Sequence, residues 1–173
     1  PQGTPVTIFT VTPEEVLCGF SAVAGQSAYY ASAVAATDTT AIRVPQRACA
    51  RLLRREPEFA VAVLAIYHTR MRHMAEAISL APAPVEQRLA HTLLRLKASF
   101  GQTIPVTHKE LARMAGTRLE TSIRTIARMK RQAWLRSSRG KITVLNPRQL
   151  HTLLQSIRGR DGVATRDETA GGR

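Results

Sequence analysis

The chain has 173 residues, of which 44% are hydrophobic and 21% are charged, enough apolar content for an ordinary folded core. Its formal net charge of +13 indicates a polyanionic partner, nucleic acid first and an anionic membrane surface second. The sequence has no run of about 18 apolar residues to cross a bilayer, and its two cysteines lack CxxC spacing, which argues against a disulfide framework or a metal site. We expect a reduced, cytoplasmic protein without a membrane partner.

The basic charge is concentrated towards the C-terminus. Residues 1–100 contain 10 Lys and Arg against 7 Asp and Glu, whereas residues 101–173 contain 15 against 5, a net charge of +10. A region that binds a polyanion is therefore predicted in the C-terminal part of the chain.

Short alternating apolar segments characterise residues 5–44 and are typical of strands. Four strands are predicted here: Val6–Val11, Val16–Cys18, Tyr29–Val34 and Thr39–Val44. Four strands are few for a closed roll or sandwich, and the chain begins with Pro1, so we expect the sequence to start inside a larger domain. A short helix, Pro45–Arg55, completes this predicted first region of residues 1–56.

A longer helix is predicted from Pro57 to Leu80, before Pro82 and Pro84 stop it. Its apolar residues recur at alternating spacings of four and three, at Ala60, Leu64, Tyr67, Met71, Met74, Ile78 and Ala81. This heptad register suits a two-stranded coiled-coil seam. We interpret residues 57–81 as a dimerisation helix, and the alternative is an amphipathic helix packed on its own core. The predicted interface residues are Leu64, Tyr67, Met71, Met74 and Ile78.

Two capping boxes follow a further predicted helix, Val85–Phe100. They are the segments 107–110 and 117–120, each running from a threonine, whose hydroxyl can accept from an orphan amide, to a glutamate that reaches back to the cap. Ala115 and Gly116 lie between the helices that these boxes would begin. The small side chain allows close crossing of two helices, and glycine allows the positive φ of a sharp turn. The pattern predicts a helix-turn-helix centred on residues 108–131, with a plain α-hairpin as the alternative.

The second helix of this motif, residues 118–132, carries the candidate base contacts, and its buried side is expected to include Ile126 and Met129. Glu120 can accept from cytosine N4, and Arg124 can donate to guanine O6 and N7. Arg118 is a third base-reading candidate. The alternatives are a capping role alone for Glu120 and a phosphate contact for Arg124.

Residues 136–145 predict a two-stranded hairpin with a basic tip, a wing that can contact phosphates on the flanking backbone. Trp134, just before it, is expected in the core. A last short helix is predicted for Arg148–Ile157, and residues 158–173 are expected to be disordered. The residues predicted to contact phosphate are Thr107, Thr117, Thr121, Arg128, Arg139 and Lys141.

This order of segments resembles the Crp/Fnr family of bacterial transcription regulators. The likeness covers nearly all of residues 5–157, and residues 107–135 are similar to the family's signature region, with the strongest match at Thr117, Glu120, Thr121 and Arg124. The resemblance implies an α+β fold with three parts: a partial, cyclic-nucleotide-binding-like β-roll, a long dimerisation helix, and a winged helix-turn-helix over residues 83–157. It implies a homodimer on a two-fold symmetric operator, with double-stranded DNA, a second copy and RNA polymerase as partners.

Two departures from the family's pattern affect what the resemblance implies. In the recognition helix the family often has Arg or a small residue before the Glu and Ser before the Arg, whereas this chain has Leu119 and Ile123, so we expect a different operator. The family's cyclic-nucleotide binders use a Gly-Glu pair and an Arg-Ser pair. The matching positions here, 18–19 with 29–30 or 26–27, supply no arginine as a counter-ion, so no response to cyclic AMP is expected.

Other functional classes have less support. A non-specific nucleoid or RNA-binding protein would share the charge but would not require paired capping boxes, and 5% aromatic content is low for stacking on single-stranded bases. The histidines have no metal-site spacing such as HExxH, and the chain has no nucleophile elbow or phosphate-binding glycine loop. Cys18 alone is too few for an iron–sulfur centre, which needs about four ligands. We therefore expect neither an enzyme nor a bound cofactor.

Overall fold

The computed structural model describes residues 7–8, 10–13, 15–17 and 31–161, with side chains as far as residue 155. The chain divides into two compact units, Val11–Glu76 and Ala77–Arg173 together with Pro1–Thr10. No helix within the described residues is both long enough and apolar enough to cross a membrane.

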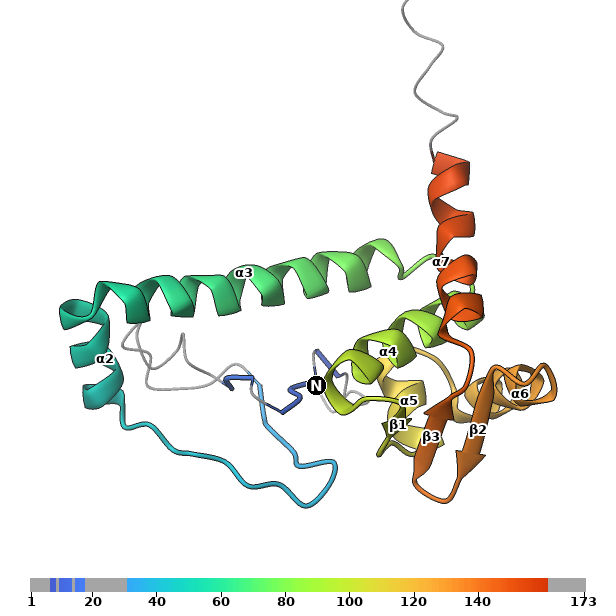
Figure 1. Ribbon diagram of the computed structural model, residues 1–173, viewed down its shortest axis with the longest axis horizontal. Helices are drawn as coiled ribbons and strands as arrows, with labels where there is room; N and C mark the ends of the chain where they lie inside the picture. The colour runs from blue at the N-terminus through green and yellow to red at the C-terminus, as the bar shows by residue number, and fades with distance from the viewer. Residues whose placement is uncertain (1–6, 9, 14, 18–30, 162–173) are drawn as a thin grey trace, which may run out of the picture. The chain divides into compact units, whose positions relative to one another are not determined.

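Two helices follow prolines in the first half of the chain. Helix α2 is Gln46–Arg55, and helix α3, Pro57–Ser79, is the long helix of Figure 1. Pro45 is extended, with φ −61° and ψ 142°, and acts as the N-cap of α2 instead of its first residue. The predicted helices Pro45–Arg55 and Pro57–Leu80 are therefore confirmed to within one residue at an end.

The strand predicted at Thr39–Val44 is wrong, because residues 31–45 contain no strand. Ile42 in this segment is 94% exposed. An alternating sequence becomes a strand only where a neighbouring strand pairs with its amide and carbonyl groups, and none does so here. The described residues of the other three predicted strands, 7–8, 10–11, 16–17 and 31–34, are not in a strand either, so these predictions are wrong there. Residues 6, 9, 18 and 29–30 lie outside the described residues, and the β-roll stays a prediction.

Helix α3 buries none of its residues within the single chain. Three members of its heptad stripe are more than 60% exposed: Leu64, Met71 and Ile78. Met74, in the same stripe, is 38% exposed. Phe59, Val63, Ile66 and Tyr67 of the same helix are half-buried within the single chain, so the dimerisation helix and the amphipathic helix packed on its own core both stay open.

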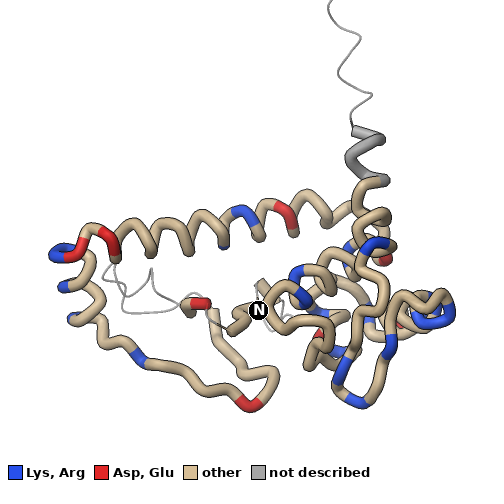
Figure 2. The backbone as a smooth tube through the Cα atoms, in the orientation of Figure 1, with Lys and Arg blue, Asp and Glu red and all other residues tan. Residues whose placement is uncertain are grey.

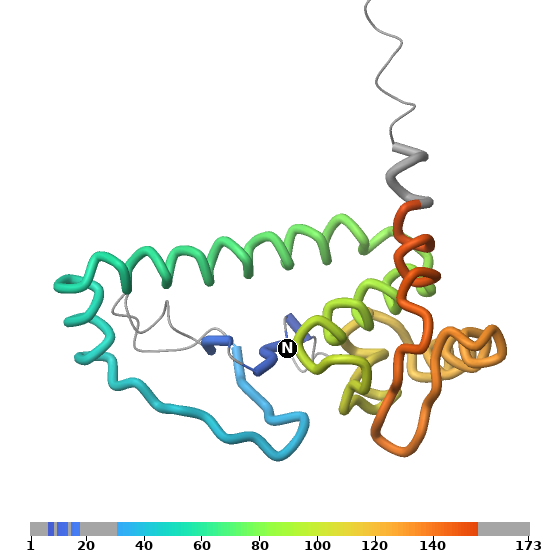
Figure 3. Tube along the Cα trace, in the orientation of Figure 1, coloured from blue at the N-terminus to red at the C-terminus, as the bar shows by residue number. Residues whose placement is uncertain are grey.

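The unit that contains Ala77–Arg173 holds the remaining helices and a small sheet, which confirms the predicted α+β class. Figure 3 follows the chain through this unit. Its elements are α4 (Val85–Phe100), β1 (Thr103–Ile104), α5 (His108–Met114), α6 (Leu119–Arg131), β2 (Leu135–Ser138), β3 (Lys141–Val144) and α7 (Pro147–Asp161). Helix α7 extends beyond the predicted Arg148–Ile157, so the expectation of disorder is wrong for residues 158–161.

One hydrophobic core joins these elements, and α4 provides much of it. Helix α4 matches its predicted bounds and packs along α7, with further contacts to α5 and α6. Trp134 is half-buried against this core, as expected. The largest fully buried apolar residues are Leu89, Leu93, Leu96, Ile104, Leu111, Ile126, Met129, Ile142, Val144 and Leu150.

The predicted wing is confirmed as an antiparallel hairpin of β2 and β3, with Ser138 opposite Lys141. Gly140 lies in its tip with φ +70°, a conformation that favours glycine. Strand β1, which the sequence did not predict, pairs antiparallel with the other edge of β3, so the sheet order is β1-β3-β2. The third strand ties the wing to the end of α4.

Candidate nucleic-acid interface

Helix α5 begins with the predicted capping box at Thr107. The Thr107 Oγ1 accepts from the amide of Glu110 at 3.2 Å, and a carboxylate oxygen of Glu110 accepts from the Thr107 amide at 2.8 Å. The Thr107 hydroxyl also donates to this carboxylate at 2.7 Å. Its proton is thus engaged inside the cap, and a phosphate contact by this hydroxyl, as predicted, would require that bond to open.

The turn after α5 has the features that the sequence indicated. Ala115 is buried where α5 meets α6, and Gly116 has φ +59°. The Thr117 amide donates to the carbonyl of Ala112 at 2.9 Å, which closes the end of α5. The predicted helix-turn-helix is therefore confirmed as α5, a tight turn and α6.

The second predicted capping box, from Thr117 to Glu120, is wrong. The N-cap of α6 is Arg118, which is extended with φ −75° and ψ 148°, and no side chain caps this helix. Thr117 precedes the cap because its amide is already bonded back to α5, so Glu120 occupies the second helical position instead of the third. Glu120 is exposed and does not support the start of α6 as a capping box would.

Helix α6 separates sharply into a buried and an exposed side. Its buried residues are Ser122, Thr125, Ile126 and Met129, which confirms the predicted apolar side. Glu120 and Arg124, the two leading base-reading candidates, are both exposed on the other side, and Arg118 is exposed at the cap. The last turn adds three cations, Arg128, Lys130 and Arg131.

Arg128 takes part in the fold as well as in this surface. Its guanidinium forms an ion pair with the Glu86 carboxylate of α4 at 2.5 Å, and the side chains are 49% and 25% exposed. The pair ties the last turn of α6 to the start of α4. The predicted phosphate contact of Arg128 stays a prediction. Its guanidinium would have to share that phosphate with the Glu86 carboxylate or release the carboxylate.

The wing presents further cations. Arg139 and Lys141 are exposed on either side of Gly140, and Arg136 is exposed on β2. Figure 2 shows basic residues along this hairpin and on α6. At the inner end, the ring Nε2 of His108 lies 2.9 Å from the hydroxyl of Ser137, which joins the first residue of α5 to β2. The predicted phosphate contacts Thr117 and Thr121 are half-buried in the turn and on α6.

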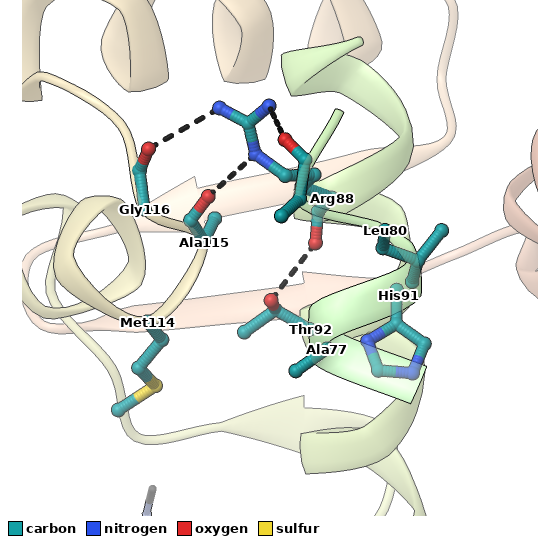
Figure 4. Close-up of a pocket in the computed structure, with 9 residues that line it drawn as sticks. Ala77, Leu80, Arg88, His91, Thr92, Met114, Ala115 and Gly116 are labelled. Carbon is teal, nitrogen blue, oxygen red and sulfur yellow. Dashed lines mark hydrogen bonds between the residues drawn. The ribbon is translucent and has the colours of Figure 1, made fainter. Parts of the chain in front are cut away.

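A single arginine of α4 holds the turn of the motif (Figure 4). The Arg88 guanidinium donates to the carbonyls of Ala115 at 2.9 Å and Gly116 at 3.2 Å. It also donates to Ala83 at 2.6 Å and to Ala81 at 3.2 Å, in the segment between α3 and α4. We call this set of four hydrogen bonds the Arg88 clamp.

The Arg88 clamp borders an open pocket of about 220 Å³ (Figure 4). Its lining residues come from the end of α3, from α4 and from the turn of the helix-turn-helix: Ala77, Leu80, Ala81, Arg88, His91, Thr92, Met114, Ala115 and Gly116. The described residues contain no group of three or more His, Cys, Asp and Glu that could hold a metal ion.

Residues 87–153 match the family model described as the Crp-like helix-turn-helix domain. The chain contains a Crp-like helix-turn-helix domain. This match confirms the resemblance to the Crp/Fnr family that the sequence indicated, over the part of the chain that holds the capping box, the turn, α6 and the wing.

Solved structures show the same relationship. A CRP/FNR-family transcriptional regulator from Thermus thermophilus is 27% identical with a TM-score of 0.52, over 58% of this chain and 56% of that protein. FixK2 from Bradyrhizobium japonicum shares the fold, with 20% identity and a TM-score of 0.57, over 64% and 59% of the two chains. The present chain thus spans between half and two thirds of the length of these proteins. No curated protein matched.

Three features of the Crp-like domain were not found from the sequence. The Arg88 clamp and the Glu86–Arg128 pair join residues far apart in the chain, so no local spacing indicates them. Arg88 directly precedes the apolar Leu89 in the sequence, but a charged residue beside an apolar one is ordinary in an amphipathic helix and does not indicate a clamp. The third feature is Ser122, whose hydroxyl is fully buried without a hydrogen-bond partner in the structure.

Proposed function

We propose that this protein is a transcription regulator that binds double-stranded DNA sequence-specifically through α6 and the wing. The observation that carries the proposal is the exposed face of α6, where Glu120 and Arg124 lie on a helix of a Crp-like domain. A helix of this size fits the major groove of B-DNA, where each base pair presents a distinct set of donors, acceptors and methyl groups. In this proposal Arg124 donates to guanine and Glu120 accepts from cytosine, with Arg118 as a further base contact.

The contacts that fix α6 within the domain favour sequence-specific binding over non-specific binding. The Arg88 clamp holds the turn before the helix, and the Glu86–Arg128 pair holds its last turn. Base contacts require a helix with a defined position in the groove, whereas phosphate attraction alone does not. A non-specific nucleic-acid-binding protein would gain little from this fixation.

The wing supplies the sequence-independent part of the affinity in this proposal. Arg139 and Lys141 flank an exposed tip and are placed to contact phosphates beside the groove that α6 enters. Each neutralised phosphate releases condensed counter-ions, so binding should weaken steeply with salt.

We further propose that the protein is a homodimer through α3. Leu64, Met71 and Ile78 follow one another at intervals of seven residues and are each more than 60% exposed in the single chain. Such a stripe leaves apolar surface in contact with water unless a second copy covers it. Tyr67 and Met74 occupy the intervening positions of the stripe. A dimer presents two α6 helices, and the operator is then two-fold symmetric with half-sites about one helical turn apart.

The remaining parts of the proposal concern location, chemistry and effector. A regulator that reads chromosomal operators acts in the cytoplasm, and the relatives' regulatory function supports a non-enzymatic role. The residues that would correspond to a cyclic-nucleotide site, 18–30, lie outside the described residues. The absence of an arginine among them in the sequence is the ground for proposing that cyclic AMP has no effect.

Selection of bound duplexes from a random pool tests the DNA-binding proposal. The purified protein is expected to enrich one two-fold symmetric sequence and to bind it at least 1,000-fold more tightly than scrambled DNA at the same salt, a ratio at the low end of those of about 10³–10⁷ for specific regulators. Equal affinity for all duplexes would instead identify a non-specific basic protein.

Sedimentation tests the dimer independently of DNA. The substitution Met71→Glu places like charges in the proposed seam and should produce a monomer at micromolar concentration. Thr69→Glu adds the same charge on the opposite side of α3, where Thr69 is exposed, and should leave the dimer intact. A wild-type monomer, or equal effects of the two changes, would contradict the proposed interface.

A further inference from the structure

Two large apolar side chains remain exposed on the first two turns of α6. Leu119 is 42% exposed and Ile123 is 44% exposed. Four residues apart, they lie on one side of the helix, directly beside Glu120 and Arg124, which have the same spacing. At about 3.6 residues per turn, these four side chains span about 140° of the helix circumference. They form one mixed surface, which we call the reading face.

Core packing does not account for this exposure. Ser122 and Ile123 are neighbours, yet the serine is fully buried with no hydrogen-bond partner and the isoleucine is 44% exposed. Folding stability alone would favour the reverse, because a buried hydroxyl without a partner is unfavourable and exposed apolar area contributes nothing. A local arrangement that opposes stability is expected at a functional surface.

The surroundings of the reading face identify its partner chemically. Arg118 at the start of α6 and Lys130 and Arg131 at its end are exposed cations, a pattern that complements phosphates. Within the major groove, the apolar group that a base pair presents is the C5 methyl of thymine. A wholly apolar protein partner would leave Glu120 and Arg124 without polar groups to bind.

We infer that Leu119 and Ile123 are specificity-determining residues that contact the C5 methyl groups of thymines in each operator half-site. The inference rests on the proposed function, since it assigns further contacts to the same helix. Glu120 and Arg124 read the polar edges of neighbouring pairs, and the two apolar residues add a requirement for thymine beside them. The half-site then contains thymines next to the guanine and cytosine that the charged pair contacts.

Replacing single thymines by deoxyuridine in the selected duplex removes only the methyl group and tests this inference. Wild-type affinity should fall about fourfold at each contacted thymine, since burial of one methyl-sized group contributes about 0.8 kcal/mol. Ile123→Ala and Leu119→Ala should each weaken binding to the thymine duplex, and each should remove the sensitivity to deoxyuridine at one position of the half-site. Both positions are exposed and alanine favours helix, so thermal melting should show folded variants.

Leu145→Ala is the matched control, because Leu145 is a large apolar side chain that is 39% exposed outside α6. This variant should retain full deoxyuridine sensitivity. A strongly selected duplex whose affinity is unchanged by deoxyuridine at every thymine would overturn the methyl contacts and leave sequence-specific binding intact. If no duplex is selected, the proposed function and this inference both fail. Weaker binding of the two variants without loss of deoxyuridine sensitivity would also overturn the inference.

Discussion

Arg88 joins α4 to the turn of the helix-turn-helix through a hydrogen bond of 2.9 Å from its Nε to the carbonyl oxygen of Ala115. The last carbonyls of a helix have no partner within it, and a cation at that end also interacts favourably with the helix dipole. The same guanidinium binds the carbonyl of Ala83, between α3 and α4. One side chain therefore fixes the turn before α6 and the segment that leads out of the proposed dimer helix.

Arg88→Met should lower the free energy of unfolding by about 1.5–3 kcal/mol, the usual contribution of a hydrogen bond to a charged group. Methionine retains much of the apolar stem and removes every donor of the clamp. Urea denaturation followed by circular dichroism measures the change. Arg113→Met, at an exposed position of α5, is the control and should have little effect. Equal stability of the two variants would show that the clamp contributes nothing to the fold.

Ser122→Ala should raise the free energy of unfolding by about 1 kcal/mol. The buried hydroxyl has no hydrogen-bond partner, and alanine favours helix more strongly than serine. Thermal unfolding measures this change, and DNA affinity should stay the same because Ser122 faces the core. A fall in melting temperature would mean that the hydroxyl has a partner, such as an ordered water molecule.

Arg124→Ala should lower affinity for the preferred duplex by about 1–3 kcal/mol and relax the preference at one base pair in each half-site. Fluorescence anisotropy with preferred and scrambled duplexes measures both effects. Arg131→Ala removes the same charge from the last turn of α6 and controls for the loss of charge alone. If Arg124→Ala weakened both duplexes by the same factor, Arg124 would be a phosphate contact, and Arg118 would be the next base-reading candidate.

Glu120→Ala should raise affinity for scrambled DNA and reduce discrimination between duplexes. The change removes a negative charge close to phosphates and deletes the proposed cytosine contact. Since α6 has no capping box at Glu120, the variant should melt at nearly the wild-type temperature. Lower affinity for all duplexes alike would contradict this role.

Substitution of Arg139 or Lys141 by alanine should weaken binding to every duplex by a similar factor. Each change should reduce the slope of log affinity against log salt by about 1, because one phosphate contact is lost. DNA titrations between roughly 50 and 200 mM salt measure this slope for each variant. A change in sequence preference would show instead that the wing reads bases.

The amino-acid sequence determined the features that depend on near neighbours in the chain. Prolines at 45, 57 and 84 placed the helix starts, because proline is favoured at or next to the first turn. The Thr107 capping box and Gly116 placed α5 and its turn, since each acts through bonds a few residues long. The resemblance to the Crp/Fnr family rested on the order of segments and on residues 107–135, and the base-reading candidates followed from the donors and acceptors on the second helix of the motif.

Only the tertiary structure decided which of several local options the chain uses. Thr117 had the sequence of a cap, but its amide bonds to Ala112 and the cap moved to Arg118. Alternation over residues 39–44 predicted a strand that has no partner in the described residues. Packing brings distant residues together in the Arg88 clamp and in the Glu86–Arg128 pair, and sequence spacing carries no information about such contacts. Packing also decides that Ser122 is buried while its apolar neighbour Ile123 is exposed.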